Sequence, residues 1–183
     1  TSQAELTDVL AKHLNIQVGL LLASDSWAGA SKWLECPYRP VTRELLLEES
    51  EVIVGGVDGG GFDDLYGLTL IGRTPNGQLL TWCHAAAHPI AMERHPELEP
   101  RYRDFEKAGD LTIVPTMGAD STFVVSIFKE IQDSGLLHSI GFDPNALGGL
   151  LAELVDAGIP EEKLARVATG WRLTAAIKTA ERY

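Results

Sequence analysis

The stretch Glu51-Val-Ile-Val-Gly-Gly-Val-Asp-Gly-Gly-Gly61 is a nearly continuous apolar run that stops at an aspartate followed by glycines. Uninterrupted apolar runs of this kind are typical of a central β-strand that is buried on both faces. Asp58 therefore stands at the carboxyl end of a predicted strand over residues 51–58. The glycines beside it would let another backbone or a ligand approach closely.

Two more strands follow this one directly. Residues 65–73 and 78–87 have the composition of strands, and Thr74-Pro-Asn-Gly77 between them is typical of a hairpin turn. The three strands together predict an antiparallel meander.

The rest of the chain alternates between helices and strands. Asp120 is the predicted cap of one helix, Pro144 suits the first turn of the next, and Gly158 ends that helix. The predicted order is a polar surface helix over 97–108, a strand over 111–114, a helix over 120–134, a strand over 136–142, a helix over 144–158, a strand over 164–168 and a helix over 173–183.

This order predicts an α/β fold of the ribonuclease H-like class. We expect a mixed sheet of about five strands, an antiparallel meander followed by parallel strands, with helices on its flanks and right-handed crossovers. In that layout the strand over 51–58 lies parallel to the strand over 137–143. Asp58 and Asp143 would then meet at the carboxyl ends of adjacent strands, about 5 Å apart at the backbone.

Two carboxylates held this close repel each other, and a divalent cation between them relieves the repulsion. Mg²⁺ or Mn²⁺ prefers oxygen ligands, and two such ions can support hydrolysis of a phosphodiester. We expect Asp58 and Asp143 to be catalytic metal ligands, with Asp64 as a further candidate ligand. Each acid also has a structural interpretation, because Asp58 could begin a glycine-rich turn and Asp143 could cap the helix after it.

The first fifty residues predict a separate helical arm. Ser2 and Glu5 form a capping box, and apolar residues at helical spacing predict an amphipathic helix over 3–14. We therefore divide the chain into an arm or linker over 1–50 and a catalytic domain over 51–183. The chain begins with Thr1, and we expect it to be processed or part of a longer protein.

The charge balance argues against a protein that holds nucleic acid by its overall charge. The 183 residues carry a net charge of −11, whereas proteins that neutralise phosphates are usually basic. Arg94, Arg101, Arg103 and Lys107 form a modest basic group that could contact DNA, although ordinary solvated surface charge is the favoured interpretation. The longest apolar run is too short to cross a membrane, and no secretory leader is visible, so we expect a cytoplasmic protein.

Several segments together resemble the nuclease domain of the large terminase subunit of tailed bacteriophages. The resemblance covers most of the chain and depends on the order and spacing of its segments. These are Lys12-His-Leu-Asn15, Trp27-Ala-Gly29, Val57-Asp58 with Asp64-Leu65, Leu111-Thr-Ile-Val-Pro115, Ile140-Gly-Phe-Asp143-Pro144, Gly170-Trp-Arg-Leu-Thr174 and Ile177-Lys-Thr-Ala-Glu-Arg182.

The resemblance implies a Mg²⁺- or Mn²⁺-dependent endonuclease that cuts concatemeric double-stranded viral DNA during genome packaging. Asp58 and Asp143 match the first two acids of that family. The family's third acid follows the helix that resembles 173–182, where this chain ends, and no motif makes Glu181 its equivalent. The resemblance also implies an ATPase motor of the same subunit, a small terminase subunit and a portal as partners. No G-x-x-x-x-G-K-[ST] motif for that motor occurs here.

Two other classes of function fit part of the pattern. Val57-Asp-Gly-Gly-Gly61 also resembles the first phosphate loop of actin-like and sugar-kinase nucleotide-binding domains. Residues 143–149 are a poor version of the second loop that those proteins need. A non-catalytic docking module, in which the acids only cap secondary structure, is the other alternative. Resolvases share the fold class but match the later segments less well.

Overall fold

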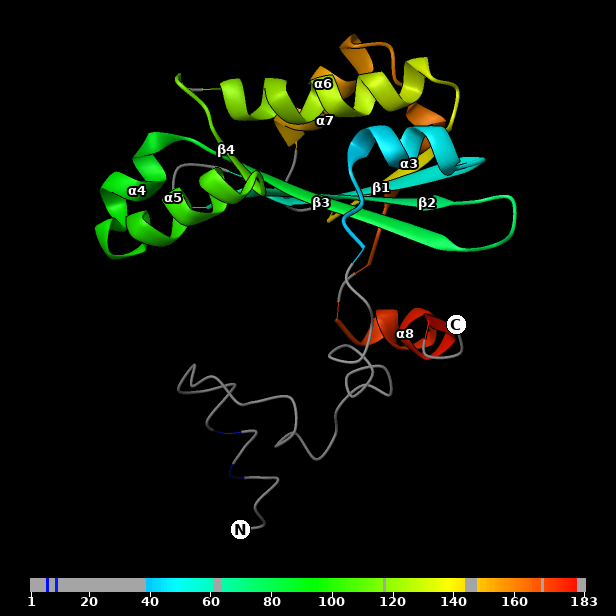
Figure 1. Ribbon diagram of the computed structural model, residues 1–183, viewed down its shortest axis with the longest axis horizontal. Helices are drawn as coiled ribbons and strands as arrows, with labels where there is room; N and C mark the ends of the chain where they lie inside the picture. The colour runs from blue at the N-terminus through cyan, green and yellow to red at the C-terminus, as the bar shows by residue number, and fades with distance from the viewer. Residues whose placement is uncertain are drawn as a thin grey trace. The chain divides into compact units, whose positions relative to one another are not determined.

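The computed structural model describes residues 6, 9, 39–60, 64–116, 118–143, 148–168 and 170–180. The chain forms two compact units, of which one comprises Val41–Thr169 and the other Thr1–Pro40 with Gly170–Tyr183. The larger unit contains a sheet and the helices that cover it (Figure 1).

The sheet has six strands in the order β4-β3-β2-β1-β5-β6. β1 is antiparallel to β2, and β2 to β3, whereas β1 and β5, β5 and β6, and β3 and β4 are parallel pairs. This mixed topology is ribonuclease H-like and confirms the predicted fold class. Each of the six strands falls on a segment that was predicted to be a strand, and their number agrees with the expected sheet of about five. The strands are β1 (Val52–Gly59), β2 (Tyr66–Arg73), β3 (Leu79–Ala87), β4 (Leu111–Ile113), β5 (Leu137–Phe142) and β6 (Leu164–Arg166).

Helices cover the two faces of the sheet unequally. One face is covered by α3 (Arg43–Glu49), α6 (Ala119–Asp133) and α7 (Gly148–Asp156), which lie together above the sheet in Figure 1. Two other helices, α4 (Pro89–Arg94) and α5 (Glu99–Ala108), pack near β3 and β4 at the far end of the sheet. A short 3₁₀ turn, η1 (Pro96–Leu98), joins them, and another, η2 (Glu161–Lys163), precedes β6.

The main core lies between the sheet and the helices of the first face. Leu46 of α3, Ile53 of β1, Phe128 of α6 and Ile140 of β5 are all completely buried in it. Because Leu46 belongs to this core, α3 is part of the same compact unit as the sheet. The unit therefore begins at Val41, ten residues before the division expected at residue 51.

Three expectations about local structure need correction or completion. Asp120 does not cap α6, because the cap is Gly118 at φ +80° and Asp120 lies inside the first turn. The helix α4 was not expected, and the predicted surface helix begins at Glu99 after η1. The hairpin turn is as predicted, with Gly77 at φ +85° and its N–H donating to the Thr74 carbonyl.

The smaller unit includes η3 (Gly170–Leu173) and α8 (Thr174–Ala180), where the last helix was predicted. Trp171 is 82% exposed, and the guanidinium of Arg172 lies over its ring. Leu6 and Val9 are helical, in agreement with the predicted first helix, whose other residues lie outside the described part. None of the described helices has the length and apolar character needed to cross a membrane.

Two adjacent glycines of β1 give a stability prediction. A Cβ on Gly55 would lie 2.3 Å from the Phe128 ring in the core, whereas a Cβ on Gly56, on the opposite face, would meet nothing within 4 Å. We expect Gly55→Ala to lower the free energy of unfolding by about 1–3 kcal/mol, as overpacking does. The matched variant Gly56→Ala should leave that free energy unchanged or slightly higher. Urea denaturation of both variants tests this, and equal stabilities would contradict it.

Candidate active site

The two acids that the sequence singles out lie beside each other in the sheet. The last registered pair between β1 and β5 is Val57 with Phe142, and the next residues on the two strands are Asp58 and Asp143. Neighbouring strands are about 4.8 Å apart. The parallel pairing predicted from the sequence is thus present, and it brings the two acids to the same edge of the sheet.

Both carboxylates belong to the face that α3, α6 and α7 leave uncovered. Successive side chains of a strand point to opposite faces. Val57 and Phe142 are buried against the helices, at 5% and 4% exposure, so Asp58 and Asp143 follow on the other face. The exposure of Val54, four residues before Asp58 on β1, agrees with this alternation.

Asp58 and Asp143 line one open groove of about 640 Å³ on this face. The other described lining residues are mostly small or apolar, and none of them is a lysine or arginine. They are Gly55, Gly56, Val57, Gly67, Leu68, Thr69, Cys83, His84, Gly141, Phe142 and Val167. The groove is therefore a shallow trough in which Asp58 and Asp143 are the only acidic groups among the described lining residues.

This donor set fits a divalent cation in part. Two carboxylates that enter one groove from adjacent strands offer the hard oxygen ligands that Mg²⁺ and Mn²⁺ prefer, with room for water and phosphate oxygens. Within the described residues, no group of three or more His, Cys, Asp or Glu side chains could hold a metal. Glu181, near the place where the resemblance would put a third acid, lies outside the described part of the chain.

Asp64 is not brought to the pair in the same way. Its carboxylate accepts a hydrogen bond from the N–H of Leu65 at 2.8 Å, and it is not among the described residues that line the groove. One of its oxygens would lie 3.3 Å from a Cβ placed on Gly59. Asp64 therefore stabilises the turn that leads into β2, next to the end of β1.

The predicted basic group is carried by α4 and α5, on the same face as the groove. Ala85 of β3 packs against these helices. Ala85 pairs with Gly67, and Gly67 pairs with Asp58, so Ala85 and Asp58 belong to the same face of the sheet. Arg103, however, forms ion pairs with both Glu99 and Glu106 of its own helix, at 3.6 and 3.0 Å. Its charge is therefore balanced locally.

The other members of the basic group differ in their surroundings. Arg101 lies over the ring of Phe105, Arg94 is in the last turn of α4, and Lys107 is in the last turn of α5. A cation in the last turn is favoured by the helix dipole without any ligand. These positions are consistent with ordinary surface charge.

The residues that form the groove floor were not among the predicted site residues. Gly56, Gly67, Thr69 and Gly141 share the face of the two acids because strand residues of the same parity share a face. Counting in steps of two from Asp58, and across the hairpin register, would have found Gly56 and Gly67.

A histidine on the helix-covered face gives the clearest electrostatic perturbation. Burial lowers the pKa of His84, and the nearby Arg43 lowers it further, whereas Asp110 and the Gly109 backbone act in the opposite direction. The ring stacks on Trp82, and Nε2 lies 2.9 Å from the hydroxyl of Thr112. His84 therefore joins β3 to β4 as a neutral side chain.

This lowered pKa predicts a pH-dependent stability. As the pH falls below the unfolded pKa of about 6.5, the unfolded chain binds a proton that folded His84 resists, so stability falls. Replacement of His84 by Gln should flatten the dependence of the free energy of unfolding on pH between about 6.5 and the lower folded pKa. Denaturant titrations at a series of pH values measure it. An unchanged slope in His84→Gln would show that another group is responsible.

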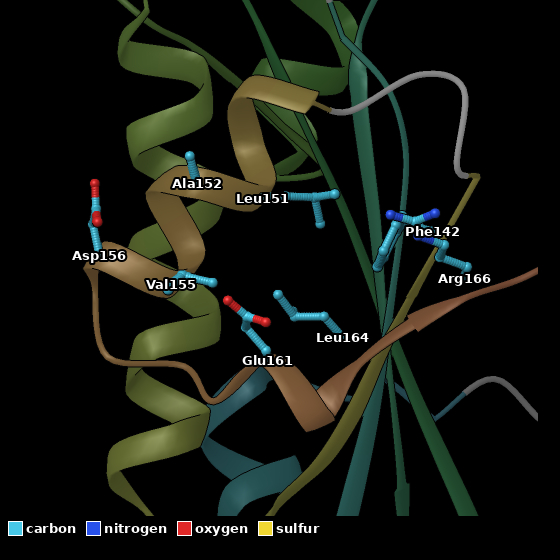
Figure 2. Close-up of a pocket in the computed structure, with 8 residues that line it drawn as sticks. All are labelled: Phe142, Leu151, Ala152, Val155, Asp156, Glu161, Leu164 and Arg166. Carbon is cyan, nitrogen blue, oxygen red and sulfur yellow. The ribbon is translucent and has the colours of Figure 1, made fainter.

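A second cavity, of about 490 Å³, lies between α7 and the β5–β6 edge and shares Phe142 with the groove. Figure 2 shows Asp156 and Arg166 at opposite ends of its lining, with apolar side chains such as Leu151 and Val155 between them. It contains neither of the paired acids. This cavity is therefore separate from the candidate active site.

A comparison with solved structures finds a likeness to the large terminase of bacteriophage HK97 over the whole chain, with a TM-score of 0.57. The two proteins share a fold. Their sequences are 18% identical, and the match covers 43% of the HK97 protein. Scans against models of known protein families and against curated proteins give no match. The shared fold agrees with the ribonuclease H-like topology of the sheet.

Proposed function

We propose that this chain is the nuclease domain of a phage-type large terminase, a metal-dependent endonuclease that cuts double-stranded DNA. The observation that carries the proposal is the meeting of Asp58 and Asp143 at the carboxyl ends of adjacent parallel strands, in one open groove. The fold shared with the HK97 large terminase supports it. Partners in genome packaging, namely an ATPase motor, a small terminase subunit and a portal, belong to the same proposal.

Asp58 and Asp143 would hold Mg²⁺ or Mn²⁺. When bound, these ions activate water and stabilise the leaving oxygen of a phosphodiester. The two aspartates contribute by fixing carboxylate oxygens on rigid, paired strands, so that little reorganisation is needed at the moment of reaction. The groove leaves the pair open to a polymer that passes across the sheet.

A direct test is to soak crystals of the protein in Mn²⁺ and to read the anomalous signal. A peak between Asp58 and Asp143 is the expected result. In parallel, Mn²⁺-dependent conversion of supercoiled plasmid to nicked or linear DNA measures the activity itself. No peak and no cleavage, or ATP binding without cleavage, would contradict the proposal.

A further inference from the structure

The groove beside the acids has a floor of bare backbone. Gly56 lies two residues before Asp58, about 7 Å away along β1, and it is paired with Thr69 on one side and Gly141 on the other. A Cβ on Gly56 would find open space for 4 Å around it. Among the described residues, a Cβ on Gly67, which pairs with Asp58, would meet only the Asp58 carbonyl oxygen, at 3.9 Å.

This floor has a wall on each side. The N–H of Val167 donates to the Phe142 carbonyl at 2.9 Å, and Cγ2 of Val167 would lie 3.0 Å from a Cβ on Gly141. Val167 thus stands over β5. On the other side, the hydroxyl of Thr69 contacts Sγ of Cys83 at 3.4 Å. Because only β1 separates β5 from β2, the floor is about 10 Å wide, two strand spacings.

The lining of the groove offers no positive charge for a phosphate. Its described residues include two carboxylates and neither lysine nor arginine. A polyanion that lies here must therefore be held by cations at the carboxylates and by close contact with the floor. Close contact is possible only where side chains are absent, as at Gly56.

We propose that Gly56 determines which phosphodiesters reach the carboxylate pair, because the space above it holds one strand of a nucleic acid next to the bond that is cut. The inference rests on the proposed nuclease function. A small phosphodiester that reaches only Asp58 and Asp143 does not need this space. Filling it should therefore discriminate against the polymer and spare the small substrate.

The test compares Gly56→Leu with the wild-type chain. Binding of a fluorescent DNA duplex is measured with Ca²⁺, and hydrolysis of plasmid DNA and of bis(p-nitrophenyl) phosphate is measured with Mn²⁺. We expect DNA binding and cleavage to fall by about tenfold or more, the scale on which a pocket rejects added side-chain carbons. Hydrolysis of the small diester, Mn²⁺ binding and the thermal unfolding midpoint should stay unchanged. Gly149→Leu, at another open glycine on α7, is the matched control and should behave as wild type.

Each other outcome has a definite meaning. Wild-type DNA binding and cleavage in Gly56→Leu would overturn the inference and leave the nuclease proposal intact. Equal losses on both substrates, or a lowered unfolding midpoint, would show a structural role and would also overturn it. A wild-type chain that neither binds DNA with Ca²⁺ nor cuts it with Mn²⁺ would overturn the nuclease proposal, and the inference with it.

Discussion

Replacement of either Asp58 or Asp143 by asparagine is expected to lower Mn²⁺-dependent DNA cleavage by roughly 10²–10³-fold or more, the scale of losing one preorganised electrostatic contact. Each substitution keeps the shape of the side chain and removes one of the two charges that would hold the cation. The stability of Asp58→Asn should not suffer, since Asp58 is exposed. Initial rates on plasmid DNA, together with thermal unfolding of each variant, give the measurement.

Asp64→Asn is the matched control for this experiment. Asp64 accepts a backbone hydrogen bond from Leu65 and is not among the described residues of the groove. An asparagine side chain can still accept that bond, so cleavage should stay close to wild type. If Asp64→Asn were as inactive as the variants of the pair, Asp64 would be a third ligand. Full activity in Asp58→Asn or Asp143→Asn would contradict the assignment of the site.

Strand order and register could be predicted because the signals for them are local. The apolar run before Asp58, the Pro-Asn-Gly turn and the shorter run before Asp143 each mark one strand and its end. The order of elements then allows few topologies. In contrast, α4 has only six residues, and its cap is the ring of His88, whose Nδ1 accepts from Ile90. A helix this short has no clear helical periodicity, and histidine is not one of the usual cap residues, so the sequence pattern did not predict α4.

The assignment of Asp120 as a cap failed for an instructive reason. Aspartate is a favourable cap residue, but it is also favoured in the first turn, where it complements the helix dipole. The chain uses Gly118 at positive φ to begin α6, and this shifts Asp120 into the helix. The sequence pattern was correct about the beginning of the helix to within two residues and wrong about the role of the side chain.

The meeting of Asp58 and Asp143 could be predicted from the sequence, whereas the surroundings of Asp64 could not. Strand order alone places Asp58 beside Asp143. The hydrogen bond that the Asp64 carboxylate accepts from the N–H of Leu65 is a local feature that no spacing rule predicts. The local pairing of Arg103 could have been foreseen, since Glu99 and Glu106 stand at i−4 and i+3 on the same helix.

Divalent cations are expected to reverse the effect of the acids on DNA binding. Without a divalent cation, the two carboxylates repel phosphates in a groove whose described lining has no lysine or arginine. Asp58→Asn should then bind a DNA duplex more tightly than wild type, by about fivefold for about 1 kcal/mol of removed repulsion at contact distance in water. With Ca²⁺ the order should invert, because the wild-type pair holds the cation that attracts the phosphate. Fluorescence anisotropy in EDTA and in Ca²⁺, at one low ionic strength, measures both cases.

Asp133→Asn separates this local effect from a change in net charge. Asp133 is paired with Lys129 at the end of α6, and its substitution removes the same formal charge away from the groove. If Asp133→Asn tightened DNA binding in EDTA as much as Asp58→Asn, the repulsion would come from the net charge of −11 on the whole chain. The order of DNA affinities of variant and wild type should invert between EDTA and Ca²⁺ for Asp58→Asn and not for Asp133→Asn. That result requires the cation to act at the Asp58–Asp143 pair. Only carboxylates that hold the cation can change from repelling to recruiting DNA.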